Sequence, residues 1–287
     1  MSGLDVPSFI HKISWAEKHL EKLECAMRKF GDSHPYRTCE FTEDKNKVRW
    51  VLEFSEDPDP EWSLIVGDFI YNVRSGLDHL AAALNPSAVR SNCMFPIVRQ
   101  EVWNIPPAQG EDQERAGLRD KWRVSTRHMD PKAVAIIQSL QPTDTHRQET
   151  EFHLLEVLNR LSNKDKHQRL LSHELGLVRP STSFEYADGF VYDIPPLDLP
   201  TPGNKAGRTA LQNKATLELP PASMTGGRGP NLIVDVEIKG AVTQAIEMTE
   251  DGRYVIVPDH LRSLLEMVRN RIVVPLTPYL HNPCGKR

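Results

Sequence analysis

The periodicity of hydrophobic residues along the chain predicts a set of amphipathic helices. Apolar residues recur at intervals of three and four positions, which places them on one face of a helix. The stretches with this pattern are residues 8–30, 62–84, 131–140, 149–171 and 259–272. Asp130 provides an N-cap and Pro131 a first helical residue for the third of them. Each apolar face needs a partner surface, so we expect these helices to pack together as a bundle.

Other stretches carry the pattern of β-strands. Residues 36–42 and 47–54 predict a hairpin, because apolar and polar side chains alternate along the second stretch. After Pro180, short β-rich segments are separated by turn-forming linkers. These segments are residues 184–194, 216–219, 232–238 and 253–257.

Helices and strands together predict an α+β fold: a bundle of long amphipathic helices with a small antiparallel sheet and a C-terminal helix. We expect residues 1–175 to form the helical bundle with the inserted β-hairpin. Residues 176–287 are expected to form a small sheet plus a C-terminal helix that packs back on the bundle. A length of 287 residues suffices for a large core in either one or two domains.

Composition restricts the compartment and the class of partner. The formal net charge is -4, so no overall basic field would draw the chain onto nucleic acid. The N-terminus lacks the pattern of a secretory signal, and no apolar run reaches the ~20 residues that span a bilayer. The cysteines are scattered without a CxxC pair, which suits reduced thiols in a cytosol; they are Cys25, Cys39, Cys93 and Cys284. We therefore expect a cytoplasmic protein without membrane insertion.

Polar residues share one face of the stretch 62–84. Asp68, Asn72, Ser75 and His79 follow one another at intervals of four, three and four residues. In a helix they lie on one face, almost opposite the apolar one. Two interpretations fit: the face is the solvated side that a surface helix has, or it lines a groove with a functional role.

The same helix holds an arginine and a histidine in a recognisable arrangement. Arg74 lies four residues before Asp78, within reach of an ion pair, and four residues separate Arg74 from His79. Gly76 lowers helix propensity, which predicts that another helix or a ligand packs closely there. The spacing, and the phrase Gly-Asp-Phe-Ile-Tyr-Asn-Val-Arg-Ser-Gly-Leu-Asp-His-Leu around it, resemble the HEPN superfamily of helical bundles, most of which are ribonucleases. The resemblance covers residues 60–175.

The resemblance implies metal-independent cleavage of RNA in a bacterial stress or defence system. His79 would be the general base or acid when a ribose 2′-hydroxyl attacks the adjacent phosphate. Arg74 would stabilise charge in the transition state, with Asn72 beside them. The resemblance implies no cofactor, and a homodimer would bring two such pairs into one cleft. The chain departs from the family in having Ser75 directly after the arginine, and the same Arg–His spacing recurs elsewhere in it.

A second polar cluster lies near the end of the stretch 149–171. If the helix continues through it, Asp165 follows the apolar line and faces inward, where it would orient His79 or pair with Arg74. If the helix ends at Asn163, Asp165 instead caps the next element of the chain. The basic residues beside it, which would suit an anionic substrate or a solvated face, are Lys164, Lys166 and His167.

Two other functions fit these helices. A bundle metal site would need ligands from two helices, although neither helix has an HExxH or ExxH pair and we assign no metal. Its ligands would be His79, Asp165, His167 and His173. A non-catalytic member of the same architecture would instead bind a protein or nucleotide partner. Convergence of Arg74 and His79 in a cleft would favour catalysis, whereas burial of Arg74 against Asp78 would favour binding.

Overall fold

The computed structural model describes the chain in segments. They are residues 7–33, 36–44, 47–54, 56, 59–85, 94–99, 101–103, 113–143, 153–167, 174–194, 226–227, 233–247 and 254–280. For most strand residues and for residues 164–167, the description covers the backbone alone.

The long helices form where the hydrophobic periodicity predicts them, except the helix at residues 113–126, which this periodicity did not predict. Their bounds are α1 (Ser8–Asp32), α2 (Glu61–Leu84), α3 (Gln113–Thr126), α4 (Pro131–Ser139), α5 (Leu154–His167) and α7 (Val257–Met267). The last helix continues into a π-helix, η4 (Val268–Val273), then α8 (Val274–Leu276) and the 3-10 turn η5 (Thr277–Tyr279). The predicted start of α4 is confirmed, because Asp130 Oδ1 accepts a hydrogen bond from the backbone N of Lys132 at 2.8 Å.

The chain forms two compact units that interleave along the sequence. Unit 1 comprises Met1–Glu21, Leu64–Leu171 and Asp259–Arg287, and unit 2 comprises Lys22–Ser63 and Ser172–Pro258. The expected regions, residues 1–175 and 176–287, divide the chain at a single point. In the structure the hairpin belongs to unit 2 and the C-terminal helix to unit 1, so both units are built from separate stretches of chain.

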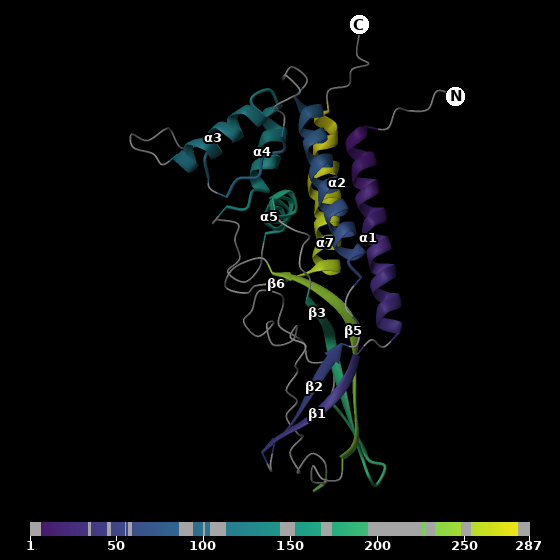
Figure 1. The fold of residues 1–287 in the computed structure, drawn as a ribbon. Helices are drawn as coiled ribbons and strands as arrows, with labels where there is room; N and C mark the ends of the chain where they lie inside the picture. Colours follow the sequence, from purple (N-terminus) through teal and green to yellow (C-terminus); the bar gives the residue numbers. More distant parts are fainter. Residues whose placement is uncertain are drawn as a thin grey trace, which may run out of the picture. The chain divides into compact units, whose positions relative to one another are not determined.

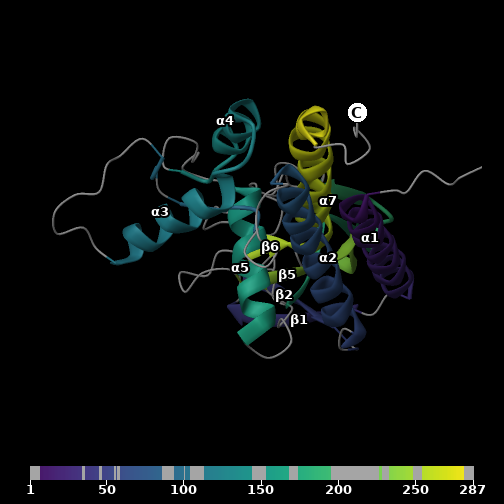
Figure 2. The same ribbon diagram turned by 90° about the horizontal axis from the view of Figure 1, so that it is seen from above.

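Helix α2 lies at the centre of unit 1. Figures 1 and 2 show it beside α1 and α7, with α5, α4 and α3 on its other side. Most of its apolar residues are completely buried, although Leu64 is 54% exposed, and each buried valine, leucine, isoleucine or phenylalanine contributes roughly 1.5–3 kcal/mol to stability. The fully buried positions include Val66, Phe69, Ile70, Val73, Leu77, Leu80 and Ala81.

Gly76 lies where α1 packs closely against α2. A Cβ atom built on Gly76 would lie 3.2 Å from Ile13 Cγ1 and 3.4 Å from the Phe9 carbonyl oxygen. Phe9, Ile13 and Ala16 form part of the buried stripe of α1 that packs here. The glycine therefore permits close helix packing, which was one of the two explanations that the sequence offered.

Unit 2 contains the strands. β1 (Tyr36–Asp44) and β2 (Lys47–Phe54) form the expected antiparallel hairpin. β3 (Glu174–Tyr186), β4 (Val191–Ile194), β5 (Ile233–Glu247) and β6 (Tyr254–Ile256) pair antiparallel in the order β4-β3-β5-β6. A turn at Gly189, with φ of 77°, divides the expected strand 184–194 between β3 and β4. The expected strand 216–219 lies outside the described residues.

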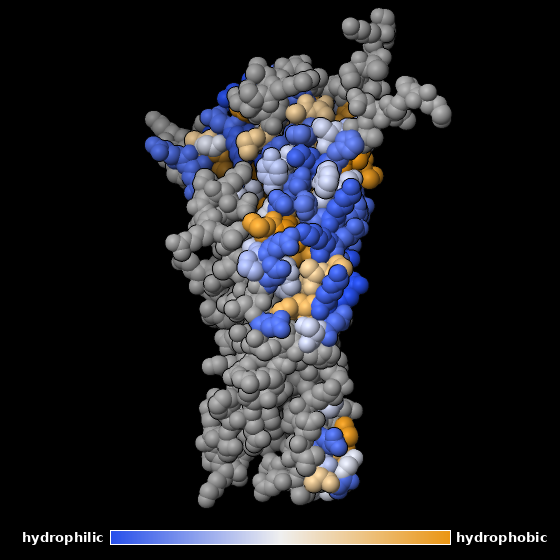
Figure 3. Space-filling model, turned by 45° about the vertical axis from the view of Figure 1, so that its right-hand side comes forward, coloured by the Kyte–Doolittle hydropathy of each residue, from blue (hydrophilic) through white to orange (hydrophobic). Residues whose placement is uncertain are grey.

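The prediction of an α+β fold is wrong, because the core that the structure describes is helical. Helix makes up 75% of the residues described with their side chains, and strand among them is limited to a short segment without a sheet. Of these strand residues only Tyr186 is buried, whereas the helices supply nearly all of the buried apolar side chains. The strands are described by the pairing of their backbones, whereas the part described with side chains is mostly helical and resembles a bundle. Figure 3 shows the hydrophilic surface that the helices of this part present on one face.

Candidate functional site

The polar face of α2 is a narrow strip of solvent-facing residues on an otherwise buried helix. Asp68 and His79 are exposed, and Asn72 and Ser75 are half-buried. Tyr71 is exposed on the same strip. These positions therefore lie on the solvent-facing side of α2, which agrees with both interpretations of this face.

Arg74 turns away from this strip and into the protein. Only 6% of the residue is exposed, although arginine is among the residues least often buried. Its Nη2 atom lies 3.0 Å from Asp78 Oδ1 and donates a hydrogen bond of 2.9 Å to the carbonyl oxygen of Phe95. Asp78 Oδ1 in turn accepts the backbone N–H of Phe95 at 2.8 Å. The ion pair therefore holds both backbone polar groups of Phe95.

Burial dominates the electrostatics of this guanidinium. It lowers the pKa of Arg74 from the usual value, and the Asp78 carboxylate acts in the opposite direction. The Nη1 atom of Arg74 is buried and has no hydrogen-bond partner within the described part of the chain. The group is thus a desolvated, paired cation inside the bundle.

Gln141 completes the attachment of the segment around Phe95. We call residues 94–99 the strap; it belongs to no helix and to no strand of the described sheets, and it is mostly buried. Gln141 Oε1 accepts the backbone N–H of Val98 at 2.8 Å, and its Nε2 donates to the carbonyl of Pro96 at 3.1 Å. Side chains thus satisfy buried backbone groups that a neighbouring strand would satisfy in a sheet.

The other two predicted catalytic residues of α2 have different partners. A hydrogen bond of 3.0 Å joins His79 Nδ1 to Ser8 Oγ at the start of α1. Asn72 donates from Nδ2 to the Asp68 carbonyl at 2.8 Å, and its Oδ1 lies 3.4 Å from Lys12 Nζ. Arg74 points to the strap and His79 to α1, so the structure does not bring this pair together.

The predicted residues on α5 are located by their backbone alone. Helix α5 continues to His167, so it does not end at Asn163, and Asp165 is a helical residue. The side chains of Asp165 and of the predicted substrate-binding residues lie outside the described part. The latter are Lys164, Lys166 and His167.

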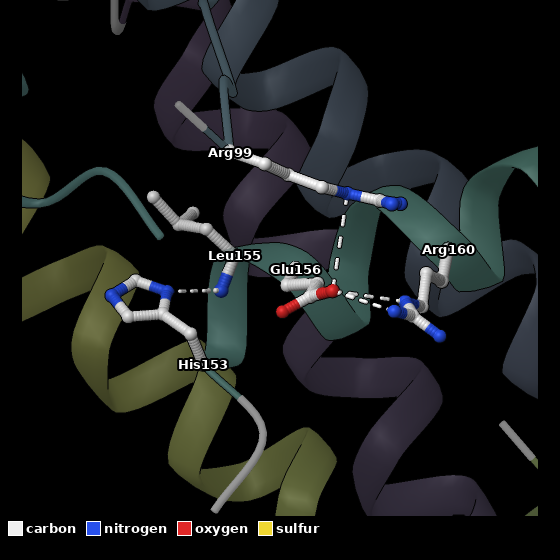
Figure 4. A network of polar contacts seen from close by, with 5 residues as sticks. All are labelled: Arg99, His153, Leu155, Glu156 and Arg160. Carbon is white, nitrogen blue, oxygen red and sulfur yellow. Dashed lines mark hydrogen bonds and ion pairs between the residues drawn. The ribbon is translucent and has the colours of Figure 1, made fainter. Parts of the chain in front are cut away.

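A buried carboxylate that the sequence did not single out lies in the first turn of α5. The Glu156 side chain is 1% exposed, and its Oε1 accepts hydrogen bonds from Arg160 Nη2 at 2.7 Å and Nε at 3.1 Å. Arg99, the last residue of the strap, approaches the same oxygen with Nε at 3.8 Å. Figure 4 shows the two guanidinium groups reaching Glu156 from separate segments. The only sequence signal was the four-residue spacing of Glu156 and Arg160, which also occurs on solvated helices.

His153 stabilises the start of the same helix. Its Nδ1 accepts the backbone N–H of Leu155 at 3.3 Å (Figure 4). Its carbonyl accepts the N–H of Val157 at 3.0 Å. The cluster therefore fixes the N-terminus of α5 and joins it to the strap through Arg99.

The described part of the chain contains no cluster of side chains that could form a metal site. There, no group of three or more histidine, cysteine or acidic side chains lies close enough to hold an ion. Of the four proposed ligands, only His79 has a described side chain; those of Asp165 and His167 are outside the description, as is His173 altogether.

Comparison with known proteins identifies no relative of this chain. No family model, no curated protein and no solved structure matches it. No helix in the described segments combines the length and the apolar character that crossing a membrane requires. The function must therefore be inferred from the geometry of the chain itself.

Proposed function

We propose that this protein is a non-catalytic binding module built on a helical bundle, with its partner bound at the exposed strip of α2 and the adjoining side of α1. In this proposal Arg74 stabilises the fold, and His79 is a surface residue hydrogen-bonded to Ser8. A location in the cytoplasm is part of the proposal, because Cys25 is a free thiol at an exposed position, which suits a reducing compartment.

The observation that carries the proposal is the position of Arg74. A catalytic arginine must present its guanidinium to a phosphate, and here the group is buried and paired with Asp78. Freeing it would break a buried ion pair, which typically costs about 3–5 kcal/mol, and would release the strap at Phe95. The competing ribonuclease function needs Arg74 and His79 in one cleft.

Ribonuclease activity, an RNA substrate and a homodimer rest on the resemblance alone and stay predictions. The basic residues of α5 do not decide between the two functions, because their side chains are outside the description. A direct assay of cleavage does decide.

The test is incubation of the purified full chain with a mixed set of labelled RNAs in excess EDTA. The variants are His79→Ala, at an exposed position, and Ser75→Ala on the same strip as the matched control. Circular dichroism first establishes that each is folded. We expect no cleavage by the wild type above a buffer control.

The contrary outcome is equally clear. Wild-type cleavage in EDTA that leaves 2′,3′-cyclic phosphate ends and is lost in folded His79→Ala, but kept in Ser75→Ala, would refute a non-catalytic module. It would show instead that a rearranged Arg74–His79 pair acts on RNA.

A further inference from the structure

Two large aromatic side chains lie in solvent on neighbouring helices of unit 1. Trp15 on α1 is 53% exposed and Tyr71 on α2 is 55% exposed. Tryptophan and tyrosine are the residues most enriched among those that dominate binding energy at protein interfaces. Their exposure on rigid helices provides two anchors whose positions are fixed before a partner arrives.

Each ring is accompanied by a lysine. Lys18 Nζ lies 4.5 Å from the centre of the Trp15 ring, and Lys12 Nζ lies 5.0 Å from that of Tyr71. Both distances are within the range of cation–π attraction. The His19 ring adjoins Trp15, with 6.1 Å between ring centres. We call the group of Lys12, Trp15, Lys18 and Tyr71 the aromatic–lysine face.

The face is continuous across the two helices. Lys12 lies one helical turn before Trp15 on α1, and its Nζ contacts both Tyr71 and Asn72 on α2. The underlying packing includes the close contact between Ile13 on α1 and Gly76 on α2. The spacing of the two aromatic rings therefore depends on the bundle core and not on the exposed side chains.

The face carries positive charge. Lys12 and Lys18 contribute two ammonium groups, and the carboxylate of Asp68 lies on the strip of α2 beside them, in a protein whose formal net charge is -4. The acidic side chain on the other flank of α1 is already paired, because Glu17 binds Arg269 through two hydrogen bonds of 2.6 Å. The face is thus a local positive patch with apolar centres.

We propose that the aromatic–lysine face binds an acidic peptide segment of another protein, in which carboxylates alternate with apolar or aromatic side chains. The carboxylates would pair with Lys12 and Lys18, and the apolar side chains would cover Trp15 and Tyr71. This inference rests on the proposed function, since it names the class of partner that the binding module takes.

The geometry favours this occupant over two others. A single-stranded nucleic acid is held along its phosphates by an extended basic groove, whereas this face offers two lysines in a protein whose formal net charge is -4. A second copy of the chain in a symmetric contact would bring the same lysines towards one another. An acidic peptide can pair its carboxylates with Lys12 and Lys18 in the positions that these lysines occupy in the structure.

The experiment is selection from a phage-displayed library of random 12-residue peptides on the immobilised full chain. Selected peptides are then labelled and titrated by fluorescence anisotropy. The variants are Trp15→Ala, Tyr71→Ala and the charge reversal Lys12→Glu; Val274→Ala, at a residue 64% exposed elsewhere on unit 1, is the matched control. A single-stranded DNA 12-mer and sedimentation of the protein alone test the other two occupants.

We expect enrichment of acidic peptides that contain apolar residues. Their affinity should fall at least tenfold in Trp15→Ala and Lys12→Glu, should weaken with added salt, and should be unchanged in Val274→Ala. Trp15 and Tyr71 are exposed and Lys12 is half-buried at the edge of the bundle, so the variants should keep a melting temperature close to that of the wild type.

Other results would overturn the proposal. They are selection without enrichment of acidic residues, peptide affinity that Trp15→Ala and Lys12→Glu leave unchanged, DNA binding that depends on Trp15, or self-association through this face. If the protein cleaves RNA in EDTA and also binds peptides in a manner that depends on Trp15, the non-catalytic function is refuted, but peptide binding at the aromatic–lysine face is confirmed. If neither RNA cleavage nor peptide binding is detected, the binding module has no identified partner, and the proposal that this face binds an acidic peptide is refuted.

Discussion

Replacing Arg74 with alanine is expected to lower the free energy of unfolding by about 3 kcal/mol. The substitution removes the partner of Asp78, whose side chain is 26% exposed, so water offsets part of the loss. It also leaves the buried Phe95 carbonyl without its hydrogen bond, which alone costs about 1–3 kcal/mol. The estimate therefore falls near the lower end of the range for breaking a buried ion pair.

Arg123 provides a matched control. It makes an ion pair with Asp120 at 3.1 Å within one helix, and both side chains are well exposed, at 67% and 70%. Arg123→Ala should cost only ~0–1 kcal/mol. Urea unfolding followed by circular dichroism gives both values, and amide hydrogen exchange at Phe95 reports on the strap directly.

The double variant Arg74→Ala/Asp78→Ala tests the cause. When both charges are removed, no Asp78 carboxylate is left without a partner. The loss in the free energy of unfolding should therefore be smaller than the sum of the losses in the two single variants. If Arg74→Ala and Arg123→Ala destabilise the protein equally, and Phe95 exchanges as slowly as in the wild type, then Arg74 does not hold the strap and our assignment of a structural role fails.

Two further predictions concern helix packing and the charge pair on the flank of α1. Gly76→Ala should lower the free energy of unfolding by about 1 kcal/mol, because displacing Ile13 costs more than the gain in helix propensity. Gly117→Ala, with no atom within 4 Å of the new Cβ, should instead raise it by about 0.5–1 kcal/mol. If thermal unfolding shows the same effect for both variants, the close contact at Gly76 is contradicted. The hydrogen bonds from Arg269 lower the pKa of Glu17, so its contribution to stability is present above the usual glutamate pKa and is lost as the pH falls through the depressed one. The stability difference between wild type and Glu17→Gln should therefore shrink in urea titrations at increasingly acid pH, and a constant difference would exclude a role for the charge.

The sequence was sufficient for many of the elements, though not for α3, and it was insufficient for their packing. Hydrophobic periodicity predicted α1, α2 and the hairpin, and Asp130 with Pro131 predicted the start of α4, because these signals are local. The α+β class failed because a pattern of strands says nothing about which side chains become buried. In the described residues the core comes from helices.

The candidate site shows the same limit. The spacing of Arg74 and Asp78 predicted an ion pair, which the structure confirms at 3.0 Å. Spacing could not reveal that the pair is buried, because its depth depends on the strap, which comes after α2 in sequence and is recognised by no periodic pattern. Gln141 was missed for the same reason: one amide after a short helix has the same local sequence whether it faces water or holds Pro96 and Val98.

The strap also has a consequence for how this protein can vary. A strand inside a sheet keeps its hydrogen bonds when neighbouring side chains mutate, because its partners are backbone atoms. The strap is bonded instead by the side chains of Arg74, Asp78 and Gln141, so a single codon change at any of them removes a main-chain partner. Among related sequences, the residues at these three positions should therefore change together or not at all. The strap residues, which are held by their backbone atoms, should more often exchange one apolar side chain for another.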